Sequence, residues 1–150
     1  HMEEIDLCWR LRSRGRGIVC IPQSVVYHVG AATLKKENPR KTFLNFRNNL
    51  LMLYKNLPEN ELKKVLFVRG ALDWLAAFVF LLKGDGKNAR AVIQARKEFK
   101  RIRPDFVSSR VENLEKATGE SIPEKVPYSI LWKFHACRKK VFSRLKSCNL

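Results

Sequence analysis

The chain has 150 residues, of which 45% are hydrophobic, and its 30 Lys and Arg against 14 Asp and Glu give a formal net charge of +16. This apolar content argues against a wholly disordered chain, and the length fits one domain. The positive charge favours an anionic partner, which could be a nucleic acid, an anionic membrane surface or a phosphorylated substrate.

The cysteines are scattered along the chain and form neither a Cys-x-x-Cys pair nor a His/Cys cluster with zinc spacing. They are Cys8, Cys20, Cys137 and Cys148. This pattern favours reduced thiols over disulfides. The first residues lack the basic and apolar regions of a signal peptide, so we expect no secretory leader.

The first predicted element is a helix over residues 3–14, in which acidic residues come first and basic residues last. That order suits the helix dipole, whose N-terminal end is positive. Gly15 is expected to end this helix. Two short apolar runs, residues 17–21 and 25–29, follow on either side of Pro22 and predict two short strands or extended segments.

Two longer helices are predicted next, over residues 40–57 and 60–83, separated by Pro58. The second contains an apolar stretch of about 18 residues, which as a helix is about 27 Å long and close to the thickness of a bilayer core. Arg69 and Asp73 lie four residues apart on one face of this helix, and each charge is costly at a bilayer centre. The sequence therefore favours a buried or interfacial helix over a membrane span.

The last third of the chain is strongly basic. A basic helix is predicted over residues 87–102, a shorter helix over 105–117, and a basic tail over 128–145 in which Trp132 and Phe134 lie among Lys and Arg. Such lysines usually form a solvated face, but the tail also suits an anionic membrane surface, where each nearby base contributes ~1 kcal/mol. No helix-turn-helix, zinc-finger or RNP motif is found, so specific nucleic-acid binding is not expected.

Acidic residues open the first helix, and two interpretations of Glu3, Glu4 and Asp6 remain. Acids in a first turn stabilise the helix dipole without any chemistry, but carboxylates also serve as general bases. His28, at the end of the second apolar run, is likewise either structural or a ligand for a divalent metal or a phosphate. Spacing alone does not decide between these readings.

The motifs at the start of the chain form an ordered series. The series comprises Glu3-Glu4, Asp6-Leu7, Trp9-Arg10, Gly15, Ile18–Ile21, Pro22 and Val25–His28. It resembles the end of the catalytic GT-A domain in family-two glycosyltransferases, especially the rhamnosyltransferase-like group. The resemblance is strong over the first third of the chain, and it continues more weakly through Arg47-Asn48-Asn49 to about residue 100.

The resemblance implies roles for particular residues. In that family the second acid of the pair deprotonates the acceptor hydroxyl, which attacks the anomeric carbon of the donor sugar in one inverting step. Glu4 holds this position, where the family most often has Asp. Glu3, Asp6 and Arg10 would face the acceptor or orient the helix. His28 would ligate a divalent metal, Mg²⁺ or Mn²⁺, which neutralises charge on the leaving group.

The resemblance also implies a nucleotide-sugar donor and a saccharide or lipid-linked acceptor, with peripheral attachment to the inner, cytoplasmic face of the cytoplasmic membrane. The chain contains no Asp-x-Asp metal motif and no Gly-rich phosphate loop. We therefore expect a fragment that is inactive alone and binds no metal by itself. The Gln-x-x-Arg-Trp motif of processive synthases is also missing, which favours the transfer of a single sugar.

The expected fold is mainly α, with short β segments from the end of a GT-A catalytic domain followed by a helical C-terminal extension. We assign residues 1–39 to the incomplete catalytic domain, 40–122 to the helical extension and 123–150 to the basic amphipathic tail. Unpaired strand edges within residues 18–29 predict self-association. The alternative function is that of a cationic helical module that binds membranes or proteins without catalysis.

Overall fold

The computed structural model describes part of the chain. The described residues are 1–27, 38–119, 122, 125, 130–135, 137, 138 and 141. The chain divides into two compact units, residues 1–120 and 121–150, and each is considered by itself. The described part of the second unit contains one short helix, α6 (Ile130–His135).

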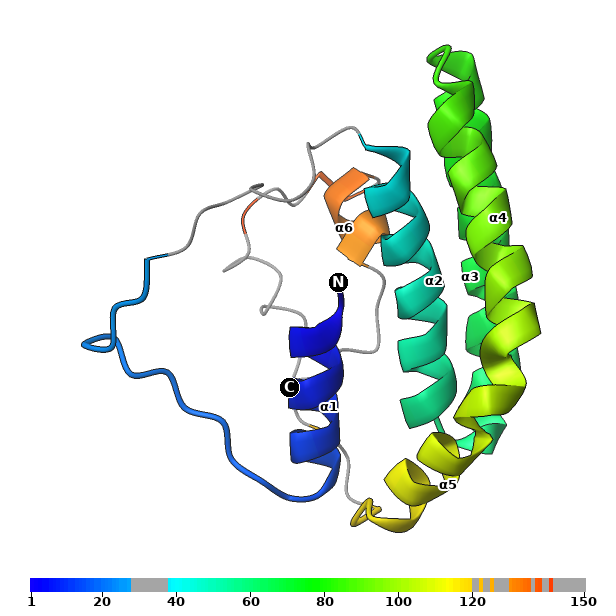
Figure 1. Ribbon diagram of the computed structural model, residues 1–150. Coiled ribbons are helices and arrows are strands. Elements are labelled where there is room, and N and C mark those ends of the chain that lie inside the picture. The colour runs from blue at the N-terminus through cyan, green and yellow to red at the C-terminus, as the bar shows by residue number, and fades with distance from the viewer. Residues whose placement is uncertain are drawn as a thin grey trace. The chain divides into compact units, whose positions relative to one another are not determined.

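Helices make up most of the described part of the first unit (Figure 1). In chain order they are α1 (Glu3–Ser13), α2 (Pro39–Asn56), α3 (Glu59–Leu82), α4 (Gly86–Ile102), the 3₁₀ helix η1 (Arg103–Phe106) and α5 (Val107–Glu115). The first four predicted helices are confirmed to within about one residue at each end. The helix predicted over residues 105–117 is preceded by η1, which contains Pro104, and its α-helical part begins at Val107.

Local signals in the sequence set where these helices begin and end. Gly15 adopts a left-handed conformation with φ of +70° just after α1, which a residue with a β-carbon would adopt only with strain. The side chain of Asn38 accepts a hydrogen bond of 2.8 Å from the backbone N–H of Arg40 and caps α2. The side chain of Asp85 accepts one of 3.1 Å from the N–H of Asn88 and caps α4.

The predicted β segments are wrong. Residues 18–27 form no strand, and no strand occurs anywhere in residues 1–27 and 38–119; positions 28 and 29 of the second run lie outside the described residues. A strand needs a partner for its backbone N–H and C=O groups, and the described helices offer none. Val26 and Tyr27 are 83% and 96% exposed, so the run also buries no apolar face. The strand edges that motivated the expected self-association are therefore not present in residues 18–27.

The core lies where α4 packs against both α2 and α3 (Figure 1). The buried face of α4 consists mostly of small side chains, which let both neighbours approach closely. These residues are Ala89, Ala91, Val92, Ala95 and Phe99. Phe99 clusters with Leu50 and Leu51 of α2, and its ring meets the ring of Tyr54 edge-on at 6.3 Å between centroids.

α3 carries a buried carboxylate on the side that faces α4. The side chain of Asp73 is fully buried; one oxygen lies 2.7 Å from Arg69 Nε and the other accepts a hydrogen bond of 2.6 Å from Arg96 Nη1. A β-carbon at Gly70 would lie 3.2 Å from the Arg96 guanidinium, so the glycine leaves room for that arginine. Among the described residues, α3 is also long and apolar enough to cross a membrane, with a mean hydropathy of 2.0 over its most apolar window.

Candidate functional site

Asp6 joins α1 to α2. Its side chain is 88% shielded from solvent; one oxygen accepts hydrogen bonds from Lys55 Nζ at 2.9 Å and Arg10 Nε at 3.2 Å. The other oxygen accepts a hydrogen bond of 2.7 Å from Asn56 Nδ2. Because Lys55 and Asn56 belong to the last turn of α2, these contacts fix the position of the acidic opening of α1 against that helix.

The same network reaches α5 through two amides. Asn56 Oδ1 accepts a hydrogen bond of 3.1 Å from Asn113 Nδ2, and Asn113 Oδ1 accepts one of 3.2 Å from Arg14 Nη2. Asn56 and Asn113 are both buried, so each of these bonds satisfies a polar group that has little access to water. The network therefore ties both ends of α1 to the helical part of the unit.

The surroundings of Asp6 keep it ionised. Burial alone would raise the pKa of its carboxyl group, but the hydrogen bonds from Lys55 and Asn56 and the charges of Lys55 and Arg10 outweigh burial. The pKa of Asp6 is therefore lowered from its ordinary value. A carboxylate held in this way stabilises the folded chain and is poorly suited to exchanging a proton near neutral pH.

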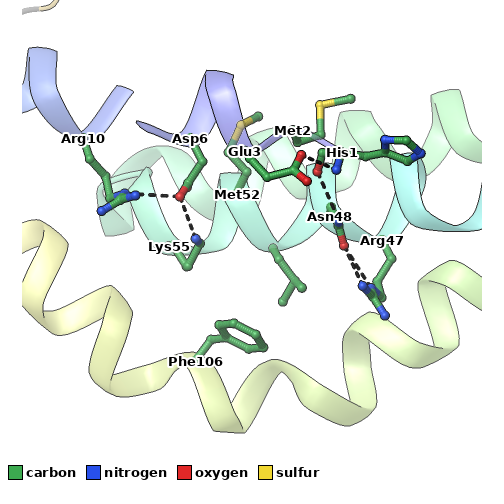
Figure 2. Close-up of a pocket in the computed structure, with 11 residues that line it drawn as sticks. His1, Met2, Glu3, Asp6, Arg10, Arg47, Asn48, Met52, Lys55 and Phe106 are labelled. Atoms are coloured by element: carbon green, nitrogen blue, oxygen red, sulfur yellow. Dashed lines mark hydrogen bonds and ion pairs between the residues drawn. The ribbon is translucent and has the colours of Figure 1, made fainter. Parts of the chain in front are cut away.

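A cavity of about 370 Å³ with both apolar and charged lining residues lies beside this network, a size within the range of small-ligand pockets (Figure 2). Its lining residues come from the start of the chain, α1, α2 and η1. They are His1, Met2, Glu3, Asp6, Arg10, Arg47, Asn48, Leu51, Met52, Lys55 and Phe106. Asn48 Oδ1 accepts hydrogen bonds from Arg47 Nε at 3.0 Å and Nη2 at 2.9 Å. The cationic and amide groups of the lining suit a hydroxyl-rich or anionic ligand.

The structure separates the acids that the sequence places together. Asp6 is buried and ion-paired, whereas Glu3 and Glu4 are exposed. Glu3 borders the cavity and forms an ion pair with the amino group of His1, as Figure 2 shows. Glu4 lies outside the residues that line the cavity, one position along the same turn of α1. Arg10 lines the cavity and hydrogen-bonds Asp6.

His28, the expected metal ligand, lies outside the described residues. In the part of the chain that the structure describes, no three His, Cys, Asp or Glu side chains gather in a way that could hold a metal ion. The described residues thus provide no ligand set for the divalent metal that the resemblance implies, and we assign no step to it.

The residues that hold Asp6 in place could not be identified from the sequence. Lys55, Asn56 and Asn113 lie 49 to 107 positions away from Asp6 in the chain. The sequence pattern marks helix faces, but it does not show which helices pack together. One signal was present in the sequence. Asn56 is a polar residue in the last turn of its helix, and most of the residues next to it in the chain are apolar, which is typical of a buried amide with a hydrogen-bond partner.

Asp6→Asn is expected to lower the free energy of unfolding at neutral pH by about 2 kcal/mol, because it removes a buried carboxylate and leaves Lys55 without its counter-charge. The pKa of Asp6 is lower in the folded chain than in the unfolded chain. Its contribution is therefore complete above the unfolded pKa of about 4 and is lost as the pH falls toward the folded value.

Urea unfolding of the wild-type chain and of Asp6→Asn, at neutral, mildly acidic and strongly acidic pH, measures the contribution of the Asp6 carboxylate to stability. The difference between wild type and Asp6→Asn should be constant above about pH 5 and shrink below about pH 4. A difference that stayed the same across the whole range would mean that the Asp6 carboxylate is not held ionised by the fold.

Comparisons of the chain with protein-family models, with curated proteins and with solved structures found no match.

Proposed function

We propose that this chain is part of an inverting family-two glycosyltransferase, which transfers a sugar from a nucleotide-sugar to a hydroxyl group of a saccharide or lipid-linked acceptor. The observation that carries the proposal is the ordered series of motifs over residues 3–28, from Glu3-Glu4 to Val25–His28. Single motifs of this kind are weak signals, and their order and spacing give the series its specificity.

The separation of the acids argues against Asp6 as the general base and leaves the exposed Glu4, which the resemblance puts in that role. A general base must reach the proton that it removes, and it must be able to gain and lose that proton. Asp6 does not meet the second condition, because it is buried and held as an ion by Lys55, Arg10 and Asn56. Glu4 is exposed on the first turn of α1, whose position the Asp6 network fixes.

In the proposed reaction the Glu4 carboxylate accepts the proton of the acceptor hydroxyl. The acceptor oxygen then forms a bond to the anomeric carbon while the bond from that carbon to the nucleotide diphosphate breaks. The diphosphate leaves with the electron pair, and the configuration at the anomeric carbon inverts. Glu has one methylene more than the Asp usual in the family, so the acceptor would lie correspondingly further from the backbone of α1.

The test is the Glu4→Gln substitution in the full-length protein that contains this chain, assayed for turnover of nucleotide-sugars. Glu4→Gln keeps the size of the side chain but cannot accept a proton, so kcat should fall by about a hundredfold or more. The matched control is Glu115→Gln, which changes an exposed carboxylate of α5 outside the cavity lining and should leave kcat within about threefold. Unchanged turnover in Glu4→Gln would show that the base role is wrong.

A further inference from the structure

α3 exposes a continuous apolar surface to solvent. We call this surface the apolar face. It consists of Phe67, Val68, Leu72, Trp74, Leu75, Phe78, Val79, Leu81 and Leu82. Phe67 is 81% exposed and Leu82 is 71% exposed, so the face stays uncovered from one end to the other. Exposed apolar surfaces of this extent mark sites of contact with a membrane or a protein.

The face occupies about half of the helix circumference, because successive residues of a helix are rotated by about 100°. The opposite side of α3 is buried through Leu62, Gly70, Asp73 and Ala77, and α3 packs against α4. The described helices therefore pack against the other side of α3 and do not cover the apolar face. It is a second surface on the far side of the helix from the core.

Charged groups avoid the apolar face and gather at its ends. Between Lys64 and Lys83 the charged residues are Arg69 and Asp73, which pair with each other on the buried side. Exposed lysines stand at both ends, Lys63 and Lys64 before the face and Lys83 and Lys87 after it. The acids near the two ends are Glu59, Glu61 and Asp85. The stretch of 18 residues between Lys64 and Lys83 carries no charge besides Arg69 and Asp73 and is about 27 Å long.

We propose that the apolar face of α3 binds an anionic phospholipid bilayer, with the helix lying in the plane of the interface. The apolar side chains enter the acyl region, and the lysines at both ends contact the anionic headgroups. This inference rests on α3 and its surroundings, without the Glu4 site, and goes beyond the proposed sugar transfer. An assay of turnover and an assay of vesicle binding can each fail without the other.

The charges favour a bilayer over a second copy of the chain. If two apolar faces paired along their length, an antiparallel arrangement would bring Lys63 and Lys64 against the Lys83 and Lys87 of the other copy. A parallel arrangement would bring each lysine pair against its own equivalent. Both arrangements bring lysines together, and two of the nearby acids are engaged within the chain, Glu59 with Arg110 and Asp85 with the start of α4. Anionic headgroups attract all four lysines.

The ion pairs favour a helix in the membrane plane over one that spans the membrane. Asp73 is held by Arg96 of α4, so α3 would have to take α4 with it or break this contact. α4 also exposes Lys97 and Lys100, and such charges are costly at a bilayer centre. Lying flat, α3 keeps the Asp73 ion pairs and the whole of α4 on the aqueous side.

The test is sedimentation of the 150-residue chain with phosphatidylcholine vesicles, prepared with and without phosphatidylglycerol. We expect binding to the anionic vesicles and weaker binding to the neutral ones and at high salt. The double substitution Phe67→Glu with Phe78→Glu should weaken binding to the anionic vesicles by about a hundredfold or more, because it places charges in the acyl region. The matched control is Val107→Glu with Val111→Glu, which makes the same change of charge at exposed apolar positions of α5 and should weaken binding far less.

The orientation is measured by quenching of tryptophan fluorescence with brominated lipids. Trp9 and Trp132 are replaced by Phe in every variant, and Trp74 is also replaced by Phe where the tryptophan is placed at 67 or 82. A single tryptophan at position 67, 74 or 82 should be quenched at the same shallow depth. A deeper position for Trp74 than for the two ends would indicate a span and overturn the proposal.

Three further results would overturn the proposal. The first is a wild-type chain that does not bind anionic vesicles. The second is an equal loss of binding in the α3 and α5 variants, which would show that charge alone matters. The third is a wild-type dimer in light scattering that Phe67→Glu with Phe78→Glu converts to monomers, because the face would then belong to a second copy. Unchanged far-ultraviolet circular dichroism shows that each variant is folded.

Discussion

Asp73→Ala is expected to lower the free energy of unfolding by about 3 kcal/mol, one of the two largest effects on stability that we expect from a single substitution. The carboxylate is fully buried and contacts Arg69 at 2.7 Å and Arg96 at 2.6 Å. Without it, two guanidinium groups would share the contact between α3 and α4 with no counter-charge. Unfolding in urea, followed by circular dichroism, measures the loss.

Two variants separate this effect from the loss of any acidic residue. Glu112→Ala removes a half-exposed carboxylate that pairs with Lys116 at 2.7 Å, and it should cost less than about 1 kcal/mol. The triple variant Arg69→Met, Asp73→Leu and Arg96→Met removes all three charges and should recover most of the stability, because no unpaired charge stays buried. If Asp73→Ala cost no more than Glu112→Ala, the carboxylate would have to be better hydrated than its burial indicates.

The positions of the helices were predictable from the sequence because local residues set them. Gly15, Asn38, Pro58 and Asp85 stand at helix ends in the structure, where backbone conformation or capping explains each of them. Whether residues 17–27 form strands could not be predicted in the same way. The β-branched residues near Val25 favour an extended backbone, but only a partner strand would make that segment part of a sheet.

The interior of the candidate site was not predictable, because it depends on which helices meet. The sequence predicts that Asp6 faces an acceptor or orients its helix, and it places Arg10 on the same helix. It could not identify Lys55, Asn56 or Asn113, which come from α2 and α5. The same limit applies to Asp73: its partner Arg69, four positions away, follows from helix geometry, but Arg96 lies on another helix.

Arg110→Ala is expected to lower the free energy of unfolding by about 2–4 kcal/mol, the second of these effects. Arg110 is a buried residue of α5, and its guanidinium donates hydrogen bonds to the C-terminal end of α2. Its Nη1 donates to the carbonyl oxygen of Leu57 at 2.7 Å and also to that of Tyr54, and its Nη2 donates to Glu59 Oε2 at 2.9 Å. The last carbonyl groups of a helix have no partner within the helix, so these bonds satisfy acceptors that the fold has buried.

The planar guanidinium of Arg110 makes contacts that the ammonium group of a lysine cannot all make. The guanidinium also lies over the Tyr54 ring, 5.2 Å from its centroid, so one planar group makes the hydrogen bonds and the stacking contact together. Arg110→Lys should therefore restore only part of the stability lost in Arg110→Ala. The control is Arg101→Ala, which removes a 72%-exposed arginine that pairs with Glu98 and should cost less than about 1 kcal/mol. Full recovery by Lys would show that the charge of Arg110, and not its fork of donors at the end of α2, stabilises this corner.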